Sequence, residues 1–131
     1  MSEPSIESAI PVVRVTSFTD AMPLYKALGF RVYWQHRLTP DGPRLTSVVL
    51  GGAELYLTEH PVAPFEAVIY FVVHGLDELV ERARARGFAP SFGPEEREWG
   101  DREAYFTDVD GNVLRLGESK TGEQTPAPGT A

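Results

Sequence analysis

The sequence predicts an α+β protein built from two successive βαβββ modules, and two observations lead to this prediction. A short apolar run that leads into an amphipathic helix occurs at residues 10–15 and again at residues 68–73. Each helix is followed by runs with the two-residue alternation of strands, separated by glycine-containing turns. A repeat of this kind is typical of a duplicated structural unit.

In the first module, we expect a helix after the strand at residues 10–15. Thr19 is a candidate N-cap, and Gly29 supplies the stop at the other end. Pro23 lies near the first turn, so some irregularity is expected there. The apolar stripe of this helix consists of Leu24, Tyr25 and Leu28.

Three strands are expected to follow this helix. They cover residues 30–36, 44–50 and 53–58, and Gly51-Gly52 forms the turn between the last two. The first module therefore spans about residues 9–60.

The second module, at about residues 66–118, contains the clearer helix, which ends at Gly87. Two strands are distinct after it, at residues 103–107 and 112–116. The remaining strand is expected within residues 88–99, where Pro90 and Pro94 make it short or place it on a sheet edge. The apolar stripe of the helix consists of Leu76, Leu79, Val80 and Ala83.

The two modules are expected to form a single domain at residues 9–118. Residues 1–8 are expected to be flexible, and residues 119–131 to be a disordered tail, because neither segment has periodic apolar residues. The 131-residue length and the 42% hydrophobic content are ordinary for one globular domain.

Charge and cysteine content exclude several classes of function. The 19 acidic and 12 basic residues give a net charge of −7, which argues against binding of nucleic acids or anionic membranes. This charge suits a cationic ligand, or serves only for solubility. The absence of cysteine rules out disulfides and thiolate sites. With no signal peptide and no apolar run of about 20 residues, we expect a cytoplasmic protein.

Several motifs resemble the vicinal oxygen chelate superfamily, which includes glyoxalases, extradiol dioxygenases and bleomycin resistance proteins. Residues 24–30, LYKALGF, are similar to the family's FYxxLGF, and residues 108–112, DVDGN, to its DPDGN. Residues 57–60 (LTEH), 99–103 (WGDRE) and 114–118 (LRLGE) resemble the bleomycin resistance branch. The resemblance implies curled mixed sheets around a shared concave cleft, and a homodimer with ligand clefts at its interface.

Metal-using members of this superfamily place histidine, glutamine or glutamate at four positions. The resemblance puts these positions at Ile10, Tyr56, Val68 and Arg115, none of which is a useful metal ligand. Strand alternation supports part of this placement independently, because the leucines that flank Tyr56 and Arg115 must face a helix. We therefore expect no metal and no other cofactor.

Neither the histidines nor the Asp108 loop restores a metal site. His36, His60 and His74 are scattered along the chain, as surface or capping residues are. Residues 108–112 superficially resemble a calcium loop, but Val113 stands where an EF-hand needs glycine. A hairpin turn is the expected structure there.

Two tryptophans are the first candidates for contact with a ligand. Trp99 lies in a polar loop, and the resemblance implies stacking on a flat ring, whereas core packing or an interface is the alternative. Either Trp34 or Tyr33 faces the cleft, with Trp34 favoured and core packing left open. The remaining candidates are Tyr56, Arg115, Glu103 and Arg102, the last two of which form a structural pair in the alternative reading.

A cationic part of a ligand has four candidate partners near the expected cleft mouth. These carboxylates, each of which is otherwise a solvated surface charge, are Glu59, Glu98, Asp101 and Glu103.

The leading hypothesis is a homodimeric, metal-independent protein that sequesters a flat, cationic antibiotic of the bleomycin type without chemical turnover. The first alternative is a metal-dependent lyase, isomerase or dioxygenase of the same superfamily. The second is a binding domain for an unrelated flat ligand or for another protein.

Overall fold

In this computed structural model, which describes residues 3–37, 39–61 and 64–119, each half of the chain folds into one strand, one helix and three further strands. The first half contains β1 (Val12–Arg14), α1 (Phe18–Leu28), β2 (Arg31–Arg37), β3 (Arg44–Leu50) and β4 (Ala53–Thr58). The second half contains β5 (Val68–Val72), α2 (Leu76–Ala85), β6 (Phe92–Glu96), β7 (Asp101–Thr107) and β8 (Val113–Ser119). The predicted tandem βαβββ fold is confirmed.

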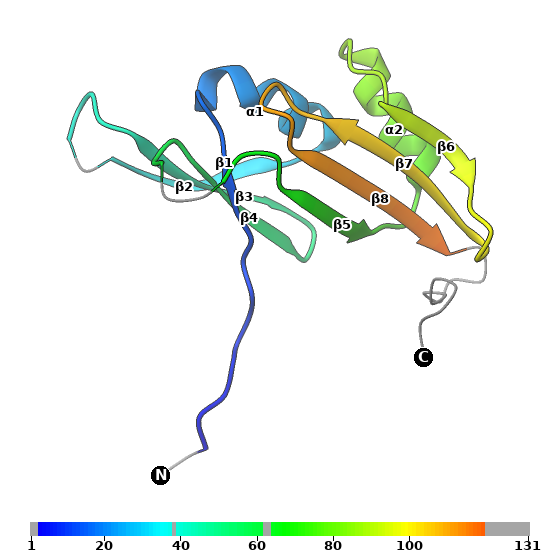
Figure 1. Cartoon of the computed structure of the whole chain (residues 1–131), viewed down its shortest axis with the longest axis horizontal. Helices are drawn as coiled ribbons and strands as arrows, with labels where there is room; N and C mark the ends of the chain where they lie inside the picture. Colours follow the sequence, from blue (N-terminus) through cyan, green and yellow to red (C-terminus); the bar gives the residue numbers. More distant parts are fainter. Residues whose placement is uncertain (1–2, 38, 62–63, 120–131) are drawn as a thin grey trace.

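The eight strands form two mixed four-stranded sheets with the same internal order. The first sheet has the order β1-β4-β3-β2 and the second has the order β5-β8-β7-β6. In each sheet the first strand pairs in parallel with the last, and the other pairs are antiparallel. The proline-containing strand β6 lies on an edge, as expected. Both helices lie on the same side of the sheets (Figure 1).

Helix α1 begins two residues earlier than a cap at Thr19 would require. Ser17 is the N-cap, and its hydroxyl accepts a hydrogen bond from the Asp20 N–H. The prediction of Thr19 as the cap is therefore wrong. Gly29 ends the helix with φ of +112°, as predicted. Pro23 is the sixth residue of the helix and removes one interior hydrogen bond, although the helix continues through it.

A glutamate at the end of the last strand of each sheet binds the N-terminus of that module's helix. Glu59 accepts a hydrogen bond from the Phe18 N–H at 2.7 Å. Glu118 accepts one from the Gly75 N–H at 2.6 Å and another from the Leu76 N–H at 3.3 Å. Because the first N–H groups of a helix lack partners within it, Glu59 adds to the Ser17 cap of α1, and Glu118 takes the place of a side-chain cap in α2, whose N-cap is Gly75. The repeat thus extends to helix capping.

Glu59 makes stability depend on pH. Burial raises the pKa of Glu59, but hydrogen bonds from Arg44 and Phe18, together with the Arg44 charge, outweigh it and lower the pKa from 4.5 to about 2. The stabilisation is present above pH 4.5 and is lost as pH falls toward 2. It amounts to about 3 kcal/mol. Urea unfolding at pH 7, 4 and 3 should show a smaller loss of stability with acidification for Glu59→Gln than for the unchanged protein.

The exposed residue Glu81 provides the control for this measurement. Glu81→Gln removes the same charge from a solvated helix surface and should follow the unchanged protein at all three pH values. If the free energy of unfolding falls equally with acidification in Glu59→Gln and in the unchanged protein, Glu59 is not the source of this pH dependence.

The two modules share one hydrophobic core between the helices and the sheets. Phe30 of the first module and Phe71 of the second meet edge to face, with ring centroids 5.8 Å apart. The predicted stripes of both helices are buried in this core, apart from Leu79, which is partly buried. The two modules are therefore packed against each other through a common core.

The turn between β7 and β8, residues 108–112, also joins the two modules. Asp108 accepts a hydrogen bond from the Tyr25 hydroxyl at 2.8 Å, and Asp110 accepts from Thr16 at 2.6 Å. Asn112 donates to the Arg14 carbonyl and accepts from the Ala67 N–H. The expected hairpin turn is thus confirmed, and it also fastens the second module to the start of the first.

The face of each sheet opposite the helices, here called the open face, has no helix of the described chain over it (Figure 1). Several large apolar residues are exposed, among them Val12, Val68 and Val72 on the edge strands β1 and β5. Among the described residues, neither helix has the length and apolar character needed to cross a membrane.

The structure describes part of the two terminal segments. Residues 3–8 are exposed and form no helix or strand, whereas Ser119, assigned to the tail, is the last residue of β8. The rest of the expected tail, residues 120–131, lies outside the described residues.

Candidate functional site

Strand alternation determines which side chains reach the open face. Leu55 and Leu57 on β4 are buried, and Tyr56 between them is half-buried. On β8, Arg115 is half-buried between Leu114 and Leu116, which lie in the core. The predicted register of both strands is therefore confirmed, and Tyr56 and Arg115 lie on the open face.

On the first sheet, an aromatic pair occupies the open face. The rings of Trp34 and Tyr56 meet edge to face with centroids 5.0 Å apart. A β-bulge at Tyr33 leaves that residue outside the register and 64% exposed, while Trp34 lies opposite Ser47. The choice of Trp34 over Tyr33 as the residue on the open face is confirmed. Ser47 also donates a hydrogen bond to Glu54, at 2.5 Å.

On the second sheet, the open face is organised around the buried carboxylate of Glu103 on β7. Its Oε1 accepts a hydrogen bond from Arg115 Nη2 at 3.0 Å and a longer one from the Tyr105 hydroxyl at 3.4 Å. Its Oε2 accepts from the Tyr70 hydroxyl at 2.8 Å. The Nε of Arg97 lies 3.9 Å from Oε1. A fully buried carboxylate is thus satisfied by hydrogen bonds from β5, β7 and β8, with Arg97 as a further ion-pair partner.

Aromatic rings lie against both arginines of this group. The Arg115 guanidinium lies 5.4 Å from the Tyr70 ring centre and 4.8 Å from that of Tyr105. The Arg97 guanidinium lies 4.9 Å from the Phe92 ring and 5.1 Å from the Trp99 ring. These are distances for cation–π attraction. We call this group the Arg115 cluster; it consists of Tyr70, Phe92, Arg97, Trp99, Glu103, Tyr105 and Arg115.

The charge on Arg115 is secured by its surroundings. Burial opposes the charge, but the hydrogen bond to Glu103, together with electrostatic interactions with Tyr105, Glu103 and Tyr70, raises the pKa of Arg115 above its ordinary value. Arg115 therefore stays a cation at any working pH.

Gly117 on β8 gives the Tyr70 side chain the space to reach Glu103. A Cβ at Gly117 would collide with the Tyr70 hydroxyl. Gly117 pairs with Val72 on one side and with Glu103 on the other. A glycine is therefore needed where the phenol passes over β8.

The structure corrects the roles predicted for several charged residues. Arg102 lies on the helix-facing side of β7 and pairs with Asp77 of α2 at 3.0 Å, so it neither reaches the open face nor pairs with Glu103. Glu103 and Asp101 are fully buried, and Glu59 caps α1. Alternation places neighbours on β7 on opposite faces, which explains the first correction.

The two predicted tryptophans lie far apart within one chain. Trp34 is on β2, and Trp99 is in the turn between β6 and β7. In Figure 1 the turn between β6 and β7 lies at the right-hand end of the second sheet, whereas β2 belongs to the first sheet, on the left. The described chain therefore does not bring its two tryptophans into one site.

The residues at the four expected metal positions do not fit a metal ion. Ile10 and Val68 lack donor atoms, Tyr56 packs on Trp34, and Arg115 carries a positive charge. Among the described residues, no three histidine, cysteine, aspartate or glutamate side chains are grouped closely enough to hold a metal.

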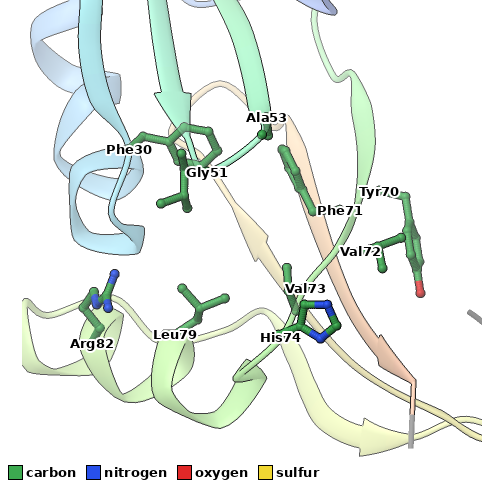
Figure 2. A pocket seen from close by; sticks show the side chains of 12 residues that line it. Phe30, Gly51, Ala53, Tyr70, Phe71, Val72, Val73, His74, Leu79 and Arg82 are labelled. Carbon is green, nitrogen blue, oxygen red and sulfur yellow. The ribbon is translucent and has the colours of Figure 1, made fainter. Parts of the chain in front are cut away.

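A cavity of about 640 Å³ lies between the β3–β4 turn, the end of β5 and α2. Figure 2 shows Phe71 and Val73 on the cavity side of β5, while Tyr70 and Val72 point to its other side. The polar side chains at the cavity, His74 and Arg82, are exposed and form no cluster. The open face carries more of the polar groups that fix a ligand.

The prediction from sequence missed Tyr70, Tyr105 and Arg97. The alternation that places Val68 on the open face also places Tyr70 there, so this signal was present. Tyr105 lies two residues after Glu103, so the same alternation places both side chains on one face of β7. No local pattern distinguishes Arg97 from the other charged residues of its loop.

Comparison with known proteins gives one family and many similar folds. A family profile described as "Glyoxalase superfamily protein" matches residues 1–123. No curated protein sequence matches the chain significantly.

Among solved structures, the chain is similar to a glyoxalase/bleomycin resistance protein from Catenulispora acidiphila. The identity is 26%, the match covers 84% of this chain and 96% of the other, and the TM-score is 0.69. An antibiotic-binding protein from a Streptomyces species has 26% identity, covers 89% and 100%, and has a TM-score of 0.68. A bleomycin-binding protein crystallised with bleomycin has 23% identity, covers 88% and 100%, and shares the fold with a TM-score of 0.67.

Proposed function

Because this chain belongs to the glyoxalase superfamily, we propose that it sequesters a small, flat molecule, an antibiotic of the bleomycin type, without transforming it. The observation that carries the proposal is the open face. Aromatic rings and guanidinium groups lie there, and the expected metal positions hold residues unable to bind a metal. Such a surface suits stacking and hydrogen bonding rather than metal-assisted chemistry.

The relatives support binding as the function. One similar structure is described as an antibiotic-binding protein and another as a bleomycin-binding protein in complex with bleomycin. Sequestration needs no catalytic residue, since protection follows from mass action alone.

The proposed binding unit is a homodimer. Trp34 and Trp99 belong to different sheets of one chain, and the turn that carries Trp99 lies at the far end of the second sheet (Figure 1). The two residues share a cleft if the first sheet of one protomer faces the second sheet of its partner. The exposed valines on β1 and β5 are the kind of apolar surface that an interface covers.

A metal-dependent superfamily enzyme is the alternative, and no observation on the open face favours it. Elemental analysis of protein purified without chelators distinguishes the two, because one tightly bound divalent ion per chain contradicts the proposal. The cytoplasmic location expected from the sequence remains a prediction.

Titration with bleomycin, followed by tryptophan fluorescence and calorimetry, tests the proposal. We expect a saturable change at micromolar drug, because stacking on an indole perturbs its emission. Trp34→Leu and Trp99→Leu should each weaken binding by about two- to thirteenfold, since ring stacking adds about 0.5–1.5 kcal/mol beyond the buried area.

The control is Tyr33→Leu, which removes an exposed aromatic ring beside Trp34 from the bulge. Its affinity should equal that of the unchanged protein. An absence of any saturable change in the unchanged protein rules out this drug. Thermal-shift screening of other antibiotic classes then tests the broader proposal of a flat ligand, since ligand at 100 times its Kd adds about 2.7 kcal/mol of stability.

A further inference from the structure

The charged groups that the Arg115 cluster exposes to a ligand are its two arginines, because its one carboxylate is buried. The side chains of Arg115 and Arg97 keep 31% and 29% of their surface exposed. Asp101 and Glu103 are 0% exposed. A molecule lying on Arg115 therefore contacts guanidinium groups and rings, and it cannot touch either of these two carboxylates. Among the described residues, the exposed carboxylate on the open face of the second sheet is Glu95, which pairs with Glu103 in the strand register and lies on the edge strand β6.

The hydroxyl donors of the cluster are already engaged. The Tyr70 and Tyr105 hydroxyls both donate to Glu103, which leaves only their oxygens to interact with a ligand. Arg115 uses Nη2 toward Glu103, and its Nε is buried. The strong donors left for a ligand therefore belong to the guanidinium groups.

Arg115 is also held in place before any ligand arrives. Glu103 fixes the end of its side chain, and the rings of Tyr70 and Tyr105 lie against its guanidinium. A fixed guanidinium loses little conformational freedom on binding, and its remaining N–H groups suit a planar oxyanion. Glu103 thus acts as a positioning residue for Arg115.

We propose that Arg115 receives a planar, negatively charged acceptor of the ligand, a carboxylate or an equivalent oxyanion, while the flat part of the ligand lies on the neighbouring rings. This inference rests on the proposed function and names the chemical class of its ligand. The net charge of −7 attracts cations only at long range, and salt screens this attraction beyond about 10 Å. The charge of the ligand group that binds is decided instead by the side chains that it touches. Arg115 thus favours an acid, in contrast to the cationic ligand expected from net charge.

Two small aromatic probes of opposite charge test the inference on the full chain. These are 2-naphthoate and 2-naphthylmethylammonium, whose dissociation constants are measured by ligand-detected NMR. We expect the naphthoate to bind at least tenfold more tightly. Arg115→Met should abolish this preference, and Arg102→Met, which removes an arginine from the opposite face of the same sheet, should retain it.

Loss of Arg115 leaves the buried Glu103 without its main cation, so the single variant is accompanied by Glu103→Gln/Arg115→Met, which removes both charges. The comparison of the two probes on the unchanged protein needs no variant. Equal or tighter binding of the ammonium, an unchanged preference in the Arg115 variants, or no binding of either probe overturns the inference. The bleomycin titration judges the proposed function separately, so the two failures are distinguishable.

Discussion

Replacing Asp108 with alanine is expected to lower the free energy of unfolding by about 3–5 kcal/mol, because several donors lose their acceptor together. The carboxylate accepts from the Tyr25 hydroxyl, the Asp110 N–H, the Asn112 N–H and Asn112 Nδ2, at 2.8–2.9 Å. Burial, followed by the charge and hydrogen bond of Asp108 and the charge of Asp110, raises the pKa of Tyr25, so its phenol remains a donor. Urea unfolding monitored by circular dichroism measures the loss.

The matched control is Asp41→Ala, which removes an exposed aspartate between β2 and β3. Its stability should stay within about 0.5 kcal/mol of the unchanged protein. A cycle with Tyr25→Phe isolates the bond between the modules, because two contacting residues should show coupling of about 0.5–3 kcal/mol. If Asp108→Ala unfolds the protein in water, Asp108→Asn combined with Tyr25→Phe still yields the comparison. A loss no greater than that of Asp41→Ala would contradict the role assigned to the turn.

The second large effect concerns the proposed dimer. We expect the unchanged protein to sediment at about 29 kDa, twice its chain mass of 14.5 kDa, and Val68→Glu/Val72→Glu to sediment as a monomer. Both valines are exposed on the edge strand β5, at 63% and 59%. Two carboxylates per chain in an apolar interface lack partners, and each buried unpaired charge costs several kcal/mol. Affinity for the antibiotic should fall more than 100-fold, because each cleft would lose half of its wall.

Val109→Glu provides the same substitution at a 69% exposed valine in the β7–β8 turn. This variant should remain dimeric and bind normally, since its valine belongs to a turn and not to either edge strand. Thermal unfolding shows whether the β5 variant is folded. A monomeric unchanged protein that still binds the drug would refute the shared cleft, and a dimeric β5 variant would place the interface elsewhere.

Local sequence patterns were sufficient for the architecture and for the orientation of most side chains on the open face. The repeated apolar runs, the helix stripes and the turn glycines predicted both modules, because each of these signals is local. The two-residue alternation of side-chain direction along a strand is also a local signal, and it correctly predicted that Tyr56 and Arg115 lie on the open face. The β-bulge at Tyr33 is consistent with the prediction that Trp34 lies on the open face, but the bulge itself became visible only in the strand register of the structure.

Only the tertiary structure determined which charged groups are partners. Glu103 was expected at the cleft mouth, but it is buried beneath donors that include Tyr70, 33 residues away. Arg102, next to Glu103 in the chain, pairs instead with Asp77 of α2. Asp110 bonds Thr16 across 94 residues. Side-chain direction follows from backbone periodicity within a strand, whereas the partner of a polar group depends on which distant elements pack beside that strand, and no local pattern contains that information.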